Sequence, residues 1–291
     1  MELIFRDRRL LFPRRPLVMG ILNINDDSFS GDGRIDAEWA LNRTREMISQ
    51  GADIIDVGGE SARTNRDAIS AGEEVRRILP FIKGFRTACD HAQPRDEQQV
   101  YPPLLSVNTW RPDVARPALE AGGEILNDIS GLPDDHNARI CAETGAALLI
   151  MHSVGLPKVP HTHVQYEDIL STLNAFFREK ILLAEKAGVP RESIILDPGI
   201  DFAKQAVDNL RIYRDLERLH HFDRPILLPV SRKSVIGRTL GISNPADRDA
   251  ATAACIVAGV QRGAAIFRVH NVEMAWRTIV SIHRMDTAFG L

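Results

Sequence analysis

The stretch GADIIDVGGESAR at 51–63 sets a pattern that the rest of the chain repeats. A short apolar run, DIIDV at 53–57, is followed directly by glycines and charged residues. Such a run, rich in β-branched residues and bounded by turn-forming residues, is typical of a buried strand. Strands of this kind belong to parallel sheets that helices cover. The stretch therefore predicts one β-strand of a parallel α/β sheet, with a polar loop at its carboxyl end.

Eight runs of this kind occur along the chain, and helix-length amphipathic segments follow most of them. The runs are 17–22, 53–57, 103–107, 124–127, 147–151, 194–197, 226–230 and 265–269. The helical segments are 36–50, 69–87, 112–121, 136–144, 167–187, 206–220, 248–262 and 272–284. Asp36 can cap the first helix and Gly51 can end it. The pattern favours a single (β/α)₈ TIM-barrel domain over 1–291, with an open doubly wound sheet as the alternative.

Two segments fall outside the βα pattern. Residues 1–16 form an N-terminal extension in which 2–12 alternate enough to predict a short hairpin covering the barrel floor. The polar stretch 89–103 has no helical or strand period and predicts an exposed insertion before the third strand.

Composition narrows the classes of partner. The chain has 291 residues, 44% hydrophobic and 26% charged, with a formal net charge of −3, so no broad cationic field favours nucleic acid or an anionic membrane. No apolar run approaches the roughly 20 residues of a membrane span, and the N-terminus does not resemble a secretory signal, so we expect a cytoplasmic location. Cys89, Cys141 and Cys255 lack zinc-site spacing and predict unpaired thiols.

Polar residues follow the predicted strands, at the end of a barrel where active sites lie. Because buried polar groups cost free energy unless they are paired, this many on one rim indicate a ligand or a dense internal network. They are Asn23, Asp56 with Gly58, Gly59 and Glu60, Asn108, Asn127, Asp128, His152, Asp197, the segment 231–234, Arg268 and His270.

Two groups of rim residues have a chemical interpretation. The segment SRKS at 231–234, together with Arg268 and His270, could form a diphosphate cradle; the alternatives are a solvated charge pair and a structural histidine. Asp197, in an Asp-Pro-Gly turn, could accept two hydrogen bonds from a flat 2-amino-pyrimidinone ring, with Asn127 on another edge; alternatively it only caps the turn. Met151 and Phe202 could sandwich such a ring or belong to the core.

At this point the sequence resembles the dihydropteroate synthase family from about residue 17 to residue 283. The matching segments are VMGILNINDDSFSGDG (18–33), GADIIDVGGESAR (51–63), SVNTW (106–110), ILNDISGL (125–132), LLIMH (148–152), ILDPGIDF (195–202), SRKSVIG (231–237), ATAA (251–254) and RVH (268–270). Any one of them is a weak match, but together and in this order they are specific.

The resemblance implies a pterin-binding barrel, usually a homodimer, that joins 6-hydroxymethyl-7,8-dihydropterin pyrophosphate to p-aminobenzoate with the help of Mg²⁺ in folate biosynthesis. It implies that Asn23, Lys233, Arg268 and His270 are catalytic, and that Asn23, Arg268 and His270 bind the pyrophosphate, with Asn23 also holding the metal. The implied pterin-binding residues are Asn108, Asn127, Met151, Asp197, Phe202 and Lys233. The implied p-aminobenzoate residues are Phe29, Ala62, Arg63 and Ser234. The first three belong to the loops at 24–34 and 60–67, which the resemblance implies close over the arylamine as lids.

Departures from the family pattern concern the pterin and the arylamine. Asn108 stands where the family has Asp, which should weaken electrostatic stabilisation of positive charge on the pterin. In the loops, Asn25-Asp26-Asp27 replaces Thr-Pro-Asp, and Ala62 and Thr64 replace Thr and Pro. Pro229 replaces Gly, and Asn271 replaces Asp. We therefore expect an active synthase with an altered arylamine pocket and reduced sensitivity to sulfonamides.

Two rival functions remain at this level. A methyltetrahydrofolate-binding methyltransferase would share the barrel, but it would have no use for the diphosphate-binding residues. A catalytically impaired pterin-binding homologue is favoured by Asn108 and opposed by the retention of the other site residues, and it would bind substrate without turnover.

Overall fold

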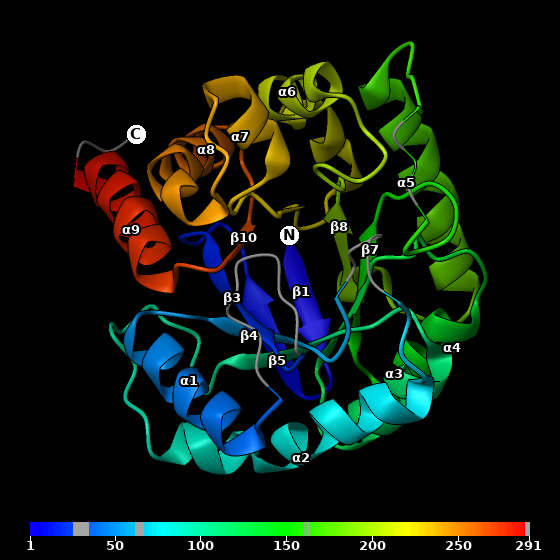
Figure 1. Ribbon diagram of the computed structural model, residues 1–291, viewed down its shortest axis with the longest axis vertical. Helices are drawn as coiled ribbons and strands as arrows, with labels where there is room; N and C mark the ends of the chain where they lie inside the picture. Colours follow the sequence, from blue (N-terminus) through cyan, green and yellow to red (C-terminus); the bar gives the residue numbers. More distant parts are fainter. Residues whose placement is uncertain (26–34, 62–66, 160, 162, 289–291) are drawn as a thin grey trace.

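The computed structural model describes residues 1–25, 35–61, 67–159, 161 and 163–288. In these residues a ring of helices surrounds a parallel sheet (Figure 1). The sheet has eight strands in the order β8-β7-β6-β5-β4-β3-β10-β9, and neighbouring strands within it pair parallel. A bridge between Leu196 and Ile226 joins its two edges. The predicted (β/α)₈ barrel is thus confirmed, and the open sheet is excluded.

The strands of the barrel coincide with the predicted apolar runs to within a few residues. They are β3 Leu17–Asn23, β4 Ile54–Gly58, β5 Leu104–Asn108, β6 Ile125–Asp128, β7 Ala147–Met151, β8 Ile194–Asp197, β9 Leu227–Leu228 and β10 Ile266–Val269. The α-helices are α1 Ala37–Ser49, α2 Ala71–Asp90, α3 Pro112–Glu120, α4 His136–Thr144, α5 Ile169–Lys186, α6 Ala206–Arg214, α7 Ser234–Leu240, α8 Asp249–Gln261 and α9 Val272–Ala288. Short 3-10 helices lie at η1 Arg191–Ser193, η2 Leu216–Phe222 and η3 Pro245–Arg248.

Helix boundaries confirm one predicted cap and correct one predicted helix. The Asp36 side chain accepts hydrogen bonds from the backbone N–H groups of Glu38 and Trp39, and Gly51 follows α1 with φ 102°. The segment 206–220 is not one α-helix, because α6 ends at Arg214 and the 3-10 helix η2 follows it. The sequence pattern predicts no helix at the position of the short helix α7.

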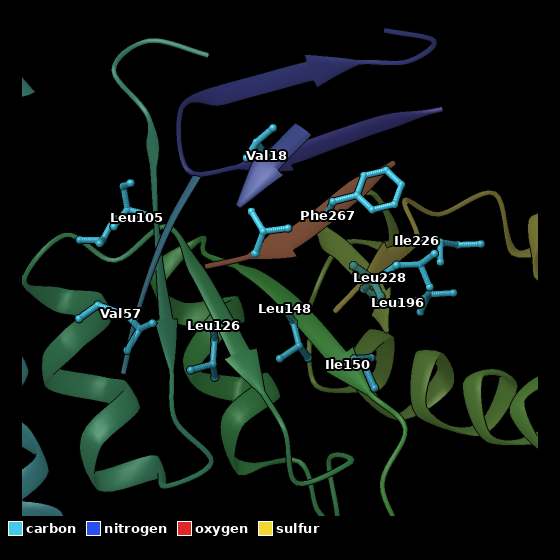
Figure 2. Close-up of a cluster of buried hydrophobic side chains, with 14 of the residues drawn as sticks. Val18, Val57, Leu105, Leu126, Leu148, Ile150, Leu196, Ile226, Leu228 and Phe267 are labelled. Atoms are coloured by element: carbon cyan, nitrogen blue, oxygen red, sulfur yellow. The ribbon is translucent and has the colours of Figure 1, made fainter. Parts of the chain in front are cut away.

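Alternating side chains of each strand divide the interior into two layers. Figure 2 shows Val57, Leu105, Leu126 and Leu148, which belong to the layer between the sheet and the helices. Their neighbours along the strands, Ile54, Leu104, Ile125 and Ala147 among them, form a second cluster. Successive side chains of a strand point to opposite faces, so this second cluster fills the inside of the barrel.

The N-terminal hairpin closes the amino-terminal end of the barrel, as predicted. Strands β1 Glu2–Phe5 and β2 Arg8–Leu11 pair antiparallel. Leu3 and Phe5 are fully buried in the inner cluster, so they cover the barrel floor with apolar surface. In Figure 1 the hairpin lies across the middle of the helix ring.

The prediction that 89–103 is an exposed insertion is correct for residues 90–91, 93–94, 97–98 and 101–102, which are exposed, and wrong for the buried residues between them. Its first residues belong to α2, and Cys89, Ala92, Gln99 and Val100 are buried. The Gln99 amide donates to the carbonyl oxygens of Ile48 at 2.9 Å and Ala52 at 2.8 Å, so a polar side chain is buried with its donors satisfied.

A buried ion pair lies close to this segment. The Arg15 guanidinium donates to both carboxylate oxygens of Asp53, at 2.9 and 3.0 Å, and both side chains are at most 1% exposed. Asp53 also accepts from the backbone N–H groups of Val18 at 2.8 Å and Val100 at 2.9 Å. One carboxylate thus joins the first strand of the barrel to the segment before β5.

Other predictions concern cysteines and membranes. Cys89, Cys141 and Cys255 are free, as expected. Within the described part of the chain, no helix is long and apolar enough to span a bilayer.

Candidate active site

A cavity of about 680 Å³ opens at the carboxyl ends of the barrel strands. The predicted site residues that the structure describes all line it: Asn23, Asn108, Asn127, Met151, Asp197, Phe202, Lys233, Ser234, Arg268 and His270. Phe29, Ala62 and Arg63 lie outside the described residues, as do most of the two predicted lid segments, 24–34 and 60–67.

Strand register explains why these side chains meet. On β4, Ile54 belongs to the inner cluster, and Asp56 points to the same side two residues later. On β10, Ile266 is likewise followed two residues later by Arg268. The inward-facing positions are therefore apolar near the hairpin and polar near the carboxyl ends of the strands. The same row of inward-facing side chains thus forms the inner core at one end and the site at the other.

Asp56 is the central acceptor of the barrel interior and has no exposed surface. It accepts from Arg268 Nε at 2.7 Å and from the Ser106 hydroxyl at 2.6 Å. The Asn127 amide nitrogen lies 3.2 Å from each of its oxygens. The sequence placed Asp56 on the rim without a role, because its partners Ser106, Asn108, Asn127 and Arg268 meet it only when four strands are brought together.

The Asp56 carboxylate also orients two amides. It can only accept hydrogen bonds, so the NH₂ groups of Asn127 and, at 3.4 Å, of Asn108 face it. Their carbonyl oxygens are then directed away from Asp56, on side chains that line the cavity. Asn108 can thus still accept a hydrogen bond from a ligand, although it lacks the negative charge of the family aspartate.

Asp197 ends β8 and is 3% exposed. Burial raises its pKa to about 6, opposed by the Gly199 N–H and by the positive charges of Lys233, Lys204 and Arg268. The Gly199 N–H donates to Asp197 Oδ1 at 2.7 Å. The Asp-Pro-Gly turn was predicted, and this bond shows that Asp197 both caps the turn and lines the cavity.

Lys233 and Phe202 stand together on the cavity wall. The Lys233 ammonium lies 5.0 Å from the centre of the Phe202 ring and donates to the Ile200 carbonyl at 3.0 Å. Burial lowers the pKa of Lys233, while Asp201 and Asp197 oppose this effect. The ammonium is therefore held next to a flat apolar ring and two carboxylates.

Lys204 and His152 form a buried pair that the sequence did not reveal. Lys204 Nζ lies 2.8 Å from His152 Nδ1 and donates to the Phe202 carbonyl at 3.0 Å. Burial lowers the pKa of Lys204 to about 7, and Asp197 opposes that shift. Burial and Lys204 together lower the pKa of His152, which is therefore neutral. The sequence placed His152 on the rim, but no spacing or motif links Lys204 to it, so only the folded chain shows the pair.

Arg268, on β10, and His270, directly after that strand, occupy alternate positions and both line the cavity. The Ser231 hydroxyl lies 2.9 Å from His270 Nδ1 and accepts the His270 backbone N–H at 3.1 Å. The Ser231 hydroxyl thus contacts both the backbone and the ring of His270 at the cavity wall.

The prediction that both cations of SRKS form the cradle is wrong for Arg232. Its guanidinium makes two hydrogen bonds to Asp249, at 2.8 and 3.1 Å, and it is not among the residues that line the cavity. The positive φ of 58° at Arg232 turns the loop at this residue. Lys233, one residue later, lines the cavity.

Ser234 begins α7 and faces an unexpected neighbour. Its hydroxyl donates to Asp201 Oδ2 at 2.9 Å, and the Val235 N–H lies 3.2 Å from both oxygens of the same carboxylate. The sequence assigned Ser234 to the arylamine but gave no role to Asp201.

Comparison with known proteins gives the class of this site. The family described as pterin binding enzyme matches residues 19–270, and the chain belongs to that family.

Within that family its relatives are dihydropteroate synthases. The chain is 37% identical over 259 residues to the dihydropteroate synthase of Escherichia coli K12, covering 89% of this chain and 87% of that protein. Dihydropteroate synthase of Yersinia pestis, solved with a sulfonamide drug, superposes with a TM-score of 0.87 at 32% identity, covering 99% and 100% of the two chains. The Xanthomonas albilineans enzyme, solved with 4-aminobenzoic acid, gives 0.81 at 31% identity, covering 94% and 93%.

Proposed function

We propose that this chain is a dihydropteroate synthase, a transferase of folate synthesis that joins 6-hydroxymethyl-7,8-dihydropterin pyrophosphate to p-aminobenzoate and releases pyrophosphate. One observation carries the proposal: a single cavity combines a buried carboxylate, two oriented amides and three basic side chains. Asp197, Asn108 and Asn127 suit the polar edges of a pterin, and Lys233, Arg268 and His270 suit a diphosphate. A methyltetrahydrofolate substrate has no diphosphate, so it would leave Lys233, Arg268 and His270 without a partner.

Binding and orientation of the pterin come first. The Asp197 carboxylate accepts from the 2-amino group and the adjacent ring N–H, and Phe202 and Met151 contact the faces of the ring. Because Asp56 holds the amide nitrogens of Asn127 and Asn108, their oxygens are set before the ligand arrives. Such preorganisation avoids an ordering cost during the reaction.

Departure of pyrophosphate follows. Arg268 is held by Asp56 and His270 by Ser231, so both side chains are fixed on the cavity wall against which the leaving oxygens would lie. The C–O bond to the diphosphate breaks as the arylamine nitrogen bonds to the methylene carbon. The arylamine then loses a proton, and no strong general base is required because its basicity is low.

Magnesium is proposed as the metal. Among the described residues, no group of three His, Cys, Asp or Glu side chains could hold a metal ion. This fits an ion carried by the substrate, because Mg²⁺ commonly takes one or two protein oxygens together with substrate phosphates and water. Asn23, on the cavity wall, would supply one amide oxygen. The ion would neutralise diphosphate charge as the bond breaks.

For the second substrate, we propose that p-aminobenzoate binds near Ser234, with Phe29, Ala62 and Arg63 on the loops that enclose it. Because Ala62 and Thr64 depart from the family pattern, the same site would respond less to sulfonamides.

We also propose a cytoplasmic homodimer. Helix α8 has the sequence DAATAACIVAGVQ, and its Ala250 and Ala254 are exposed. A helix that is apolar on every side is normally buried by other parts of the protein or by a partner. Leu240 on α7, 56% exposed, and Val207 on α6, 53% exposed, extend this surface. A second copy packed on α6–α8 would cover it, and sedimentation at micromolar protein would show the dimer.

The chemical proposal is tested by mixing the purified protein with the pterin pyrophosphate and Mg²⁺ and measuring pyrophosphate release. We expect release only when p-aminobenzoate is present, and its loss on chelation of the metal. Calorimetric binding of the pterin without any release would instead identify a catalytically impaired homologue.

A further inference from the structure

Asp201 lies where the cavity meets α7, and its backbone has a conformation that few residues adopt. Its φ is 68°, in the left-handed region that favours glycine and that aspartate tolerates. The side chain is 11% exposed and lines the cavity. Asn209 fixes the residue, because its side-chain oxygen accepts the Asp201 N–H at 2.8 Å. Strain of this kind is kept where the surroundings over-determine it, often at functional sites.

The Asp201 carboxylate engages the donors at this end of the cavity. It accepts from the Ser234 hydroxyl at 2.9 Å and from the Val235 N–H at 3.2 Å, and Arg238 lies 3.8 Å from Oδ1. Lys233 and Lys204 also interact with it electrostatically; Asp197 interacts with both lysines as well, and Asp208 interacts with Lys204. The positive charges at this end are thus offset by a carboxylate of the protein itself.

An incoming p-aminobenzoate carries its own carboxylate opposite the reacting amine. To use Ser234, Val235 or Arg238, that carboxylate must displace Asp201 or approach it as a like charge. An uncharged arylamine has no such conflict. The effect of Asp201 on substrate choice therefore depends on the charge of the arylamine and not on its ring.

We propose that Asp201 is a specificity-determining residue that lowers the preference of this enzyme for arylamines bearing a carboxylate relative to neutral ones. The proposal rests on the proposed function, since it concerns the second substrate of that reaction. Asp201 itself takes no part in the chemical step.

The test compares p-aminobenzoate with 4-aminobenzamide in the wild type and in Asp201→Asn. Asparagine keeps the shape, retains one acceptor oxygen and tolerates a left-handed backbone, so the substitution removes the charge and one of the two acceptor oxygens. For each arylamine, kcat/KM is measured with the pterin pyrophosphate and Mg²⁺, and calorimetry gives its affinity for the protein loaded with pterin and pyrophosphate. The matched control is Asp134→Asn, which removes one charge from an exposed side chain on the loop after β6, outside the cavity.

We expect Asp201→Asn to raise the p-aminobenzoate to 4-aminobenzamide ratio by roughly tenfold in both measurements, about 1.4 kcal/mol, and Asp134→Asn to leave it unchanged. An unchanged or lower ratio in Asp201→Asn would overturn the proposal. If that variant folds poorly, Asp201→Gly must give the same rise, because glycine suits the local φ. If the wild type forms no dihydropteroate, the proposed function is refuted. The affinity ratio still tests the role of Asp201, because binding of the arylamine requires no turnover.

Discussion

The pKa of Asp197 makes pterin binding depend on pH. A carboxylate that accepts two N–H groups from the ring must be ionised, and burial raises the pKa of this one to about 6. The binding-competent fraction then falls from about 0.99 at about pH 8 to about 0.09 at about pH 5, because protonation follows a single titration. The affinity for the pterin should weaken about tenfold over this range, about 1.4 kcal/mol.

The assay is calorimetry with 6-hydroxymethylpterin, which lacks the diphosphate, so that phosphate ionisation does not contribute. Asp197→Asn should bind weakly and with little dependence on pH. Lys204, whose pKa is lowered to about 7 mainly by burial, titrates nearby, and Lys204→Met separates its contribution. An affinity that is equal at the two pH values, or a wild-type pH profile that persists in Asp197→Asn, would refute this reasoning.

Three further predictions concern the leaving group, stability and inhibition. His270→Ala should lower kcat by roughly 10- to 100-fold and leave the affinity for the diphosphate-free pterin within about twofold, because one donor to the leaving oxygens is lost; an equal loss of pterin affinity would contradict the assignment. Asp53→Asn should lower the free energy of unfolding by about 3–5 kcal/mol in urea titrations, because it leaves the Arg15 charge buried; a loss below about 1 kcal/mol would show that the pair is dispensable. Sulfamethoxazole, at p-aminobenzoate concentrations near KM, should inhibit this enzyme less than the Escherichia coli relative, and equal inhibition would remove the proposed insensitivity.

Strand alternation explains how much of the fold the sequence could predict. Apolar runs bounded by turns located every barrel strand, and the rule that sites lie at carboxyl ends placed Asn127, Asp197 and Arg268 in one cavity. The buried residues of 89–103 could not be predicted, because their burial depends on partners distant in sequence. Gln99 is buried only because carbonyl oxygens from α1 and the turn after it accept its donors.

Site residues that act through a partner could not be found in this way. The role of Asp56 arises from side chains on other strands, and the pKa of Lys204 is lowered mainly by its burial, which only the folded chain produces. Arg232 and Lys233 look equivalent in the sequence. In the structure the backbone turns at Arg232, and its guanidinium binds Asp249 outside the cavity. Such differences depend on backbone direction at single residues, which composition and spacing do not encode.

The most direct test of the account is chromatographic detection of 7,8-dihydropteroate from purified protein, the pterin pyrophosphate, Mg²⁺ and p-aminobenzoate. We predict dihydropteroate in equal amount to the pyrophosphate released, and neither product without the arylamine. Pterin binding without dihydropteroate under these conditions would contradict it, and would show that the cavity binds a pterin but does not join it to an arylamine.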